Sequence, residues 1–355
     1  MDLSSLGWSE PLPRHLATRY PGHLPGRIST EHRGAYRLLG ADGERAGEVD
    51  GKLRHAARGR ADFPAVGDWV AYSPLDGARA IVHGVLPRKT ALIRKEAGSR
   101  VDEQLIAANV DVIFLMSALD GDFNLRRIER YVTLAWDSGA QPVILLNKAD
   151  LCDDVESVLD TLRLTGWGLP VHPISSLTRD GVDALAPYLA PGTTVAVVGS
   201  SGVGKSTLVN QLLGEGRQRT GGVRADDDRG RHTTTARELF VLPGGGVLID
   251  TPGMRELHLW LGEDGLGETF ADIEALALAC RFSDCAHAGE PGCAVGTALG
   301  VSLDPARLEN YRKLLREQAF LERKVDAGAQ AAARERWKRL HNDAKEHAKL
   351  KRRLT

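Results

Sequence analysis

The stretch TTVAVVGSSGVGKSTLVN, residues 193–210, decides the fold of the central part of the chain. An apolar segment typical of a buried strand runs directly into the phosphate-loop pattern G-x-x-x-x-G-K-[ST], which opens a helix. Glycines let backbone N–H groups turn towards a β-phosphate at a helix N-terminus, which favours anions. The residues expected to bind a nucleotide here are Gly199, Ser200, Ser201, Gly202, Val203, Gly204, Lys205, Ser206 and Thr207. We expect Lys205 to act catalytically on the β- and γ-phosphates and Ser206 to bind Mg²⁺.

Apolar strands and helical patterns alternate on both sides of this loop. The predicted strands are VDVIFLMSA, PVILLNKAD, LPVHPISS, TTVAVVGS, LFVLP and GGVLIDTPG, and helical patterns cover 125–138, 155–165, 182–189 and a segment from Lys205. Buried strands separated by helices indicate a mostly parallel sheet with helices on both faces. The sequence therefore predicts a central α/β domain over residues 106–258.

The segment Asn147-Lys148-Ala149-Asp150 ends one of these strands. The phosphate loop does not choose between ATP and GTP, but a carboxylate at Asp150 can accept from both N1–H and the exocyclic amine of guanine. Adenine offers no matching pair of donors, so a site built for these bonds rejects it strongly. We expect Lys148 to lay its aliphatic stem along the base and Asn147 to brace the neighbouring loops.

The segment PISS, residues 173–176, ends the next strand. Backbone N–H groups near Ser175 and Ser176 are expected to meet the guanine O6. The alternative is an ordinary helix N-cap, and the two roles are compatible.

Two further segments match the parts of a nucleotide switch that sense the γ-phosphate. Asp250 follows a predicted strand and is expected to bind Mg²⁺ through water, and the Gly253 N–H is expected to sense the γ-phosphate. Upstream, Thr233 or Thr234 supplies a hydroxyl for the same Mg²⁺, and the pattern does not separate the two. The polar, Gly-rich stretch 214–229 before them fits a switch that becomes ordered with GTP.

The sequence lacks the glutamine with which many GTPases orient the catalytic water. The residue after Asp-Thr-Pro-Gly is Met254, which cannot orient water by hydrogen bonding. We therefore expect slow intrinsic hydrolysis and a partner that completes the site. His232 is the candidate to place the water, and the alternative is a histidine that merely packs or touches RNA.

The five elements occur in the order base motif, base-loop serines, phosphate loop, threonine switch, Asp-Gly switch. A sheet tolerates such a permutation because domain termini often lie close together. The Asp-Gly switch then runs straight into the C-terminal region, so we expect the γ-phosphate state to pass to that flanking domain.

A cysteine-rich segment, CRFSDCAHAGEPGC, suggests a metal site. It contains Cys280, Cys285, His287 and Cys293, spaced C-x₄-C-x-H-x₅-C. Three thiolates and one imidazole make a closed tetrahedral set for a structural Zn²⁺. The alternative is a group of buried or scattered thiols, and Cys152 is expected to be an ordinary residue.

The regions on either side of the central domain have different sequence patterns. Residues 1–29 are Pro-rich and expected to be a loop-like extension, whereas 30–105 carries short segments with Gly and Asp-Gly turns. This pattern predicts a five-stranded barrel, either an OB-fold or an SH3-like barrel. The alternative is a generic β domain without a ligand. Residues 259–355 read as helical around the cysteine segment. From Ala331 onward, nine Lys or Arg against three Asp or Glu give a basic tail of +6.

Composition sets broad limits. The 355 residues suggest two or three domains, and 42% hydrophobic and 26% charged residues are ordinary values for a globular protein. The net charge of −1 does not by itself indicate a nucleic-acid partner. Without an apolar run of roughly 20 residues or a secretion signal, we expect a cytoplasmic protein with no membrane contact. We expect a monomer, because neither flank carries a heptad pattern.

The segments FPAVGDWV, IAANVD, NKAD, GSSGVGKSTLVN, DDDRGRHTTT and IDTPGMREL, with the cysteine cluster, carry a specific resemblance. Through them the sequence resembles the circularly permuted ribosome small-subunit-dependent GTPase A (RsgA) family. The resemblance implies an N-terminal OB-fold, a central GTPase binding GTP or GDP with Mg²⁺, and a C-terminal domain with one structural Zn²⁺. It also implies binding to the small (30S) ribosomal subunit and its rRNA during late maturation, with subunit-stimulated GTP hydrolysis.

The residues alone leave two other functions open. One is a GTP-dependent binding module in signalling or membrane traffic, and the other is a GTPase that acts on tRNA or another RNA.

Overall fold

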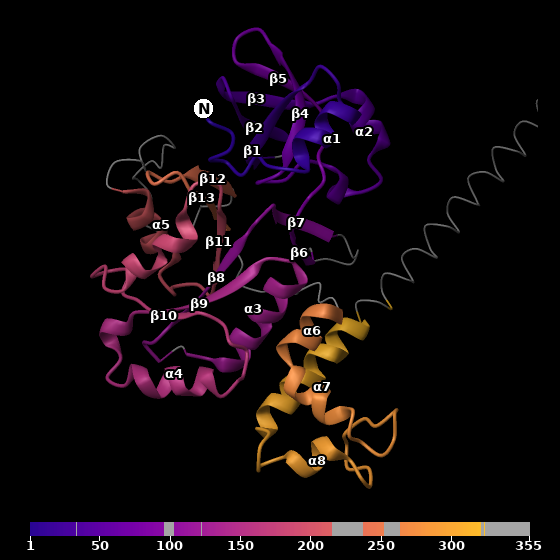
Figure 1. The fold of residues 1–355 in the computed structure, drawn as a ribbon, viewed down its shortest axis with the longest axis vertical. Coiled ribbons are helices and arrows are strands. Elements are labelled where there is room, and N and C mark those ends of the chain that lie inside the picture. Colours follow the sequence, from indigo (N-terminus) through magenta and orange to yellow (C-terminus); the bar gives the residue numbers. More distant parts are fainter. Residues whose placement is uncertain are drawn as a thin grey trace, which may run out of the picture.

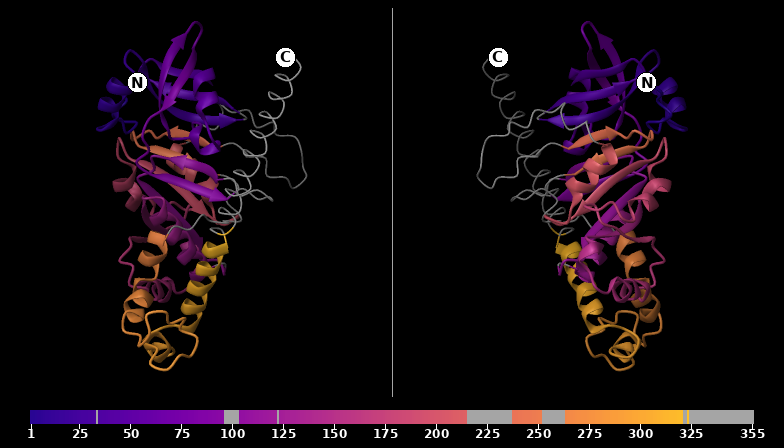
Figure 2. Two further views of the ribbon diagram at one scale, coloured as in Figure 1. Left: turned by 90° about the vertical axis from the view of Figure 1, so that its right-hand side faces the viewer. Right: turned by 90° about the vertical axis from the view of Figure 1, so that its left-hand side faces the viewer.

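The computed structural model describes residues 1–32, 34–95, 103–121, 123–214, 237–251, 263–320 and 323, without the side chains of 94, 95, 103, 263 and 264. A β-barrel, an α/β domain and a helical region are stacked along the long axis (Figure 1), and the side views of Figure 2 show the same three tiers. None of the helices within the described ranges is both long and apolar enough to span a membrane.

Five strands near the N-terminus close into a small barrel. They are β1 (Leu24–His32), β2 (Ala35–Gly40), β3 (Gly43–Val49), β4 (Trp69–Leu75) and β5 (Arg79–Val85). Their order is β1-β2-β3-β5-β4, and an antiparallel β1–β4 pairing closes the ring. Closure leaves no unpaired edge between these strands. The five-stranded barrel is the predicted OB-fold, with helix α2 (Gly51–Ala56) between β3 and β4.

The N-terminal region is more regular than its prolines predicted. Helix α1 (Leu12–Arg19) has a proline in its first turn, where a missing N–H costs nothing, and it buries Leu12 and Leu16 on one face. The first barrel strand then begins at Leu24, within the stretch expected to be loop-like. The expectation of a loop-like extension was therefore wrong from Leu12 onward.

Residues 47–56, GEVDGKLRHA, lie in the region expected to hold short strands and turns, and they contain a helix as well as the end of β3. The Asp50 carboxylate accepts a hydrogen bond from the backbone N–H of Leu53 at 2.6 Å and so caps α2.

The central sheet has the predicted parallel architecture. Its strands are β8 (Val112–Ala118), β9 (Gln141–Asn147), β10 (Val171–Pro173), β11 (Thr194–Gly199), β12 (Glu238–Val241) and β13 (Val247–Asp250). The order is β10-β9-β8-β11-β13-β12, and every neighbouring pair is parallel except β12–β13. In such sheets ligands bind beyond the carboxyl ends of the strands, which is where the predicted motifs begin.

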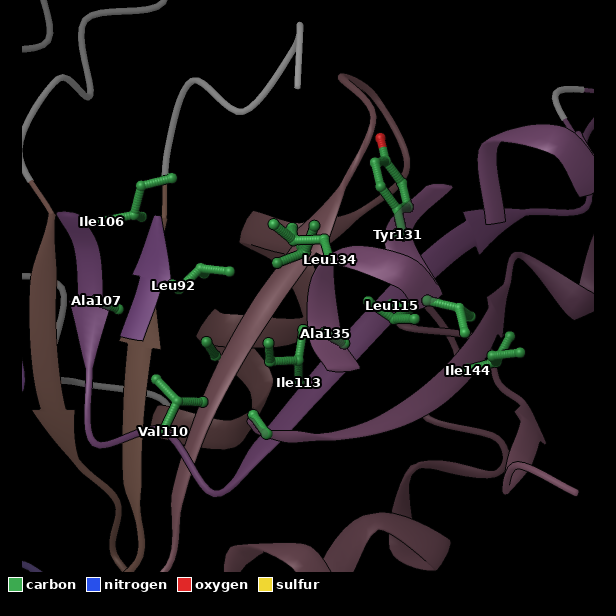
Figure 3. Packing of buried hydrophobic residues seen from close by; sticks show 14 of the residues in the cluster. Leu92, Ile106, Ala107, Val110, Ile113, Leu115, Tyr131, Leu134, Ala135 and Ile144 are labelled. Atoms are coloured by element: carbon green, nitrogen blue, oxygen red, sulfur yellow. The ribbon is translucent and has the colours of Figure 1, made fainter. Parts of the chain in front are cut away.

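Helices cover both faces of this sheet, and its strands are therefore buried on both sides. Ile113 and Leu115 of β8 pack with α3 (Leu125–Asp137), as Figure 3 shows for Leu134 and Ala135. Phe114 and Met116 point to the opposite face, which α5 (Lys205–Leu213) and η3 (Val182–Leu189) cover. The η3 segment, which was predicted to be helical, is a 3₁₀ helix, and it contains Pro187, which has no N–H to donate. Helix α4 (Val155–Arg163) lies where the sequence predicted it.

The barrel and the central sheet are joined into one sheet. Strand β1 pairs antiparallel with β12, with Thr30 opposite Glu238. Beside this junction, β6 (Ala91–Lys95) and β7 (Glu103–Ala108) form a separate two-stranded sheet. The buried Arg27 crosses the junction, donating to the carbonyls of Gly67 at 3.2 Å and Asn109 at 3.1 Å. The pattern of the sequence had not indicated that these sheets are continuous.

The C-terminal region is helical, as predicted, with α6 (Glu263–Thr269), α7 (Ala271–Ala277), α8 (Ala294–Ala298) and a helix over residues 305–320. It is fixed to α3 by a buried ion-pair network. Arg307 donates to Glu129 at 2.9 Å and to Asp272 at 2.7 and 2.8 Å. Burial raises the pKa of Glu129, although Arg126 and Arg307 oppose this shift.

Arg307→Ala should destabilise the attachment of the C-terminal region to α3. Glu129 is 0% exposed, so removing one of its partners leaves its buried charge to Arg126 and Asn310 alone, at a cost of about 3–5 kcal/mol in the free energy of unfolding. The measurement is urea unfolding followed by tryptophan fluorescence, since Trp167 lies 5.7 Å from the Arg307 guanidinium.

The matched control is Arg316→Ala, which breaks an ion pair with Glu309 whose side chains are 70% and 65% exposed. It should lower the free energy of unfolding by less than about 1 kcal/mol. Equal effects of the two substitutions would contradict the assignment of Arg307 as the main attachment.

Candidate nucleotide site and metal cluster

One buried amide connects three of the predicted motifs. Asn147 ends β9, and its Nδ2 donates to the carbonyl of Val203 in the phosphate loop at 2.7 Å. Its Oδ1 accepts from the backbone N–H of Ser176 at 2.8 Å and from the Ser176 hydroxyl at 2.9 Å. The base motif, the base-loop serines and the phosphate loop therefore meet at one place, as the bracing role predicted for Asn147 requires.

The last glycine of the phosphate loop is required by this contact. Gly204 has φ +101°, in the left-handed region, and a Cβ there would lie 2.1 Å from Nδ2 of Asn147. A side chain at position 204 would displace the amide that holds the loop. At the start of the loop, a Cβ on Gly199 would lie 2.6 Å from the carbonyl oxygen of Met116 on the adjacent strand β8.

The charged residues of the predicted phosphate site lie close together. The ammonium of Lys205 donates to the carbonyls of Gly199 at 2.8 Å and Ser200 at 2.6 Å. Burial raises the pKa of Asp250, at the end of β13, and the charge of Lys205 partly lowers it. Ser206 and Thr207 are exposed in the first turn of α5. The arrangement gives an anion both a lysine and a helix N-terminus.

The base motif has one partner that sequence reasoning missed. Lys148 has φ +61°, and its ammonium forms an ion pair with Asp120. Asp120 follows β8, and the neighbouring Leu119 donates its N–H to the carbonyl of Asn147 at 2.9 Å. The sequence did contain one signal for this pair, because Asp120 follows a strand, β8, that is adjacent to β9. Asp150 lies in the short helix η2 (Ala149–Leu151) and is exposed.

The two serines of the base loop are buried and bonded. The N–H of Ser175 donates to the carbonyl of Asp180 at 2.9 Å, and that of Ser176 donates to Asn147. The Ser175 hydroxyl accepts from the N–H of Thr178 at 3.1 Å, which is the local turn or cap role. Contact between these amides and the guanine O6 stays a prediction.

Four predicted site residues lie outside the residues that the structure describes. They are His232, Thr233, Thr234 and Gly253, and the same holds for Met254. Their roles stay predictions.

The predicted metal ligands are brought together. One ligand atom from each of Cys280, Cys285, His287 and Cys293 lies within 4.8 Å of the others. The Nδ1 of His287 is 3.6 Å from Sγ of Cys280 and 3.5 Å from Sγ of Cys293, and the two sulfurs are 4.0 Å apart. A tetrahedron with Zn–S bonds of about 2.3 Å has edges of about 3.8 Å, so the set is compatible with zinc.

A carboxylate orders the loop that presents these ligands. Glu290 accepts from the backbone N–H of Ala286 at 3.1 Å and of Ala288 at 2.6 Å, on either side of His287. Groups that orient a ligand in this way are typical of metal sites.

The comparisons with known proteins agree with this geometry. The family model for RsgA GTPases matches residues 85–260. The small ribosomal subunit biogenesis GTPase RsgA of Opitutus terrae is 48% identical over 353 residues, which cover 96% of this chain and 96% of that protein. The chain belongs to the RsgA GTPase family. The RsgA of Methanosarcina acetivorans is 44% identical over 347 residues, covering 97% of this chain and 93% of that protein.

Solved structures with the same fold explain the order of the motifs. YjeQ from Thermotoga maritima aligns with a TM-score of 0.60 at 26% identity, covering 84% of this chain and 99% of that one. YloQ, described as a circularly permuted GTPase, aligns with a TM-score of 0.58 at 27% identity, covering 85% and 97%. This RsgA-family chain is thus a GTP hydrolase with a permuted GTPase domain, as predicted.

Cys293→Ser should remove the metal from the C-terminal cluster. Cys293 is the most buried of the four candidate ligands. In proteins, a closed Cys₃His set typically holds one structural Zn²⁺. We expect the zinc content, measured by mass spectrometry of the purified protein, to fall from about one equivalent to near zero. Cys152→Ser is the control and should keep its zinc; an unchanged zinc content in Cys293→Ser would contradict the assignment.

Proposed function

We propose that this RsgA-family GTPase binds the small (30S) ribosomal subunit and its rRNA during late maturation. The observation that carries the proposal is the match to small ribosomal subunit biogenesis GTPases along nearly the whole chain, with 48% identity over 96% of both proteins for the relative from Opitutus terrae. The matched region includes the barrel, the GTPase domain and the cysteine cluster. The proposal therefore applies to all three parts of the chain. We propose that the protein acts as a cytoplasmic monomer.

We propose that GTP and GDP bind across the segments that Asn147 connects. Asp150 accepts from the guanine N1–H and amine, Lys148 covers the base, and Ser175 and Ser176 border O6. The amides of residues 199–207 surround the phosphates, and Lys205 exchanges its carbonyl acceptors for phosphate oxygens. Ser206, Thr233 or Thr234 and, through water, Asp250 would hold Mg²⁺, which would supply positive charge that neutralises the phosphates.

Hydrolysis in this proposal depends on the ribosomal partner. Met254 offers no hydrogen bond to an attacking water, so His232 or a group of the subunit positions it. GTP favours the subunit-bound form, and hydrolysis releases the protein. Cys280, Cys285, His287 and Cys293 bind one structural Zn²⁺ that keeps the C-terminal region folded.

Purified 30S subunits should stimulate GTP hydrolysis by the full chain, and the protein should co-sediment with them when a non-hydrolysable GTP analogue replaces GDP. His232→Ala should lose most of this stimulation and keep its GTP affinity, because the histidine acts on water rather than on the nucleotide. Unchanged stimulated turnover in His232→Ala would remove this residue from the mechanism. Absence of both stimulation and co-sedimentation for the unaltered chain would reject the 30S partner.

Asp150→Asn should change the base that the site selects. The carboxamide can accept from N1–H but donates where guanine also donates, whereas xanthine has a carbonyl at that position. We expect GTP affinity to fall by about a hundredfold or more and the preference to shift towards XTP, measured by competition binding. Retained preference for GTP over XTP would contradict the role of Asp150.

A further inference from the structure

The barrel carries an open cavity far from the nucleotide motifs. It lies between α1, α2 and the end of β5 and has a volume of about 470 Å³. Figure 1 shows α1 and α2 on one side of the barrel. Its wall is mainly apolar and aromatic, with Tyr20, Leu53, Ala57 and Leu86 among the lining residues. A volume of this size holds one nucleotide or a similar small group and is too small for a duplex.

All charged residues of α1 and α2 are basic, whereas Asp50 and the lining residue Asp62 stand at the two ends of the segment around α2. Between Leu12 and Tyr20, and between Gly51 and Ala61, the chain has six cationic residues and no Asp or Glu. All six are exposed: Arg14, Arg19, Lys52, Arg54, Arg58 and Arg60. The protein as a whole has a net charge of −1, so this concentration of positive charge is local. Such a surface attracts a polyanion.

Three of these arginines lie close in the chain to residues that line the cavity. Arg54 on α2 follows Leu53, and Arg58, beyond the end of the helix, follows its C-cap residue Ala57. Arg19 is one turn beyond the lining residue His15 on α1. Within the described part of the chain, the guanidinium groups of Arg19, Arg54 and Arg58 make no hydrogen bond or ion pair.

The two charged side chains in the wall are already bonded and therefore shape the cavity. Arg88 donates to Asp68 at 2.8 Å and to the carbonyls of Ala61 at 2.7 Å and Phe63 at 3.1 Å. Asp62 accepts from the backbone N–H of Arg58 at 2.7 Å. Charge complementarity for an incoming group thus comes from the arginines at the rim.

The aromatic ring in the wall is held in place. Tyr20 lies edge-on to His23, with ring centroids 6.3 Å apart, and its hydroxyl occupies the space where a Cβ on Gly84 would lie. A fixed ring beside apolar side chains suits a flat base, which stacks without regard to its identity. An acidic peptide would match the arginines but would leave this aromatic wall unused.

We propose that this cavity binds one base of single-stranded RNA, with the neighbouring phosphates on Arg19, Arg54 and Arg58. The proposal rests on the RNA partner proposed above and adds a site on the barrel. The cavity contains the carboxyl end of β5 and lies away from the β4–β5 turn, where OB-folds commonly bind their ligands.

The test uses the full chain and a fluorescein-labelled oligoadenylate of about eight nucleotides, within the usual site size of a single-strand binder. Anisotropy gives the affinity over a series of KCl concentrations. Ala56→Trp fills the cavity at an exposed lining position without changing charge. It should weaken binding by about tenfold at every salt concentration and leave the salt slope unchanged.

The paired variant Arg54→Ala/Arg58→Ala tests the phosphate contacts. Losing two contacts to a single strand should reduce the slope of log K against log salt by about 1.4. The control with equal charge loss is Arg37→Ala/Arg79→Ala, two arginines elsewhere on the barrel whose side chains are 65% and 63% exposed. The control should leave both affinity and slope near those of the unaltered chain. GTP hydrolysis without subunits should be the same in all variants.

Three results would overturn the proposal. The first is no oligoadenylate binding by a chain that 30S subunits do stimulate, which would reject this site and leave the proposed function intact. The second is unchanged affinity in Ala56→Trp, or equal losses in the rim and control pairs. The third is equally tight binding of a polyglutamate of the same length, which would identify a surface for acidic peptides instead.

Discussion

The hydrogen bonds of the Asn147 amide hold the candidate nucleotide site together. A single hydrogen bond contributes only about 1 kcal/mol net, but a buried donor or acceptor left without a partner costs about 1–3 kcal/mol. Asn147 satisfies the Val203 carbonyl and the Ser176 N–H at once, from a position that is 2% exposed. The phosphate loop is therefore positioned by the strand that carries the base motif. This contact depends on the neighbouring strands and not on the order in which the chain visits them, which is why a permuted sequence can form it.

Both flanking regions are attached to elements beside this site. The barrel joins the central sheet through β1 and β12, and β12 comes directly after the segment with the switch threonines. The C-terminal region is fixed by Arg307 to Glu129 on α3, the helix that follows β8 and Asp120. The proposed partner is a large assembly, so the proposed function needs a nucleotide site that is connected to the surfaces that bind it. In this chain the connections are a backbone pairing on one side and a buried ion pair on the other.

Sequence patterns predicted the features that depend on residues close together in the chain. The phosphate loop, the strand before it and the helix after it follow from glycine spacing and hydrophobic runs, and the cysteine cluster follows from ligand spacing alone. Two missed features are local, the helices α1 and α2 beside prolines and glycines. The other features that sequence reasoning missed are contacts across long stretches of chain. Glu129 lies among charged residues of an amphipathic helix, where a surface position would be expected. Its burial is explained by Arg307 and Asn310, which follow it by 178 and 181 residues. The Lys148–Asp120 pair and the β1–β12 junction likewise depend on which strands become neighbours.

The most direct measurement is the affinity of Asn147→Ala for GDP and GTP, by titration of a fluorescent analogue of each. We predict that both affinities fall by at least about tenfold and by similar factors, because the lost bonds position the loops rather than contact one nucleotide. The unfolding of the barrel and of the C-terminal region should not change. Affinities equal to those of the unaltered chain would show that the amide does not hold the site together.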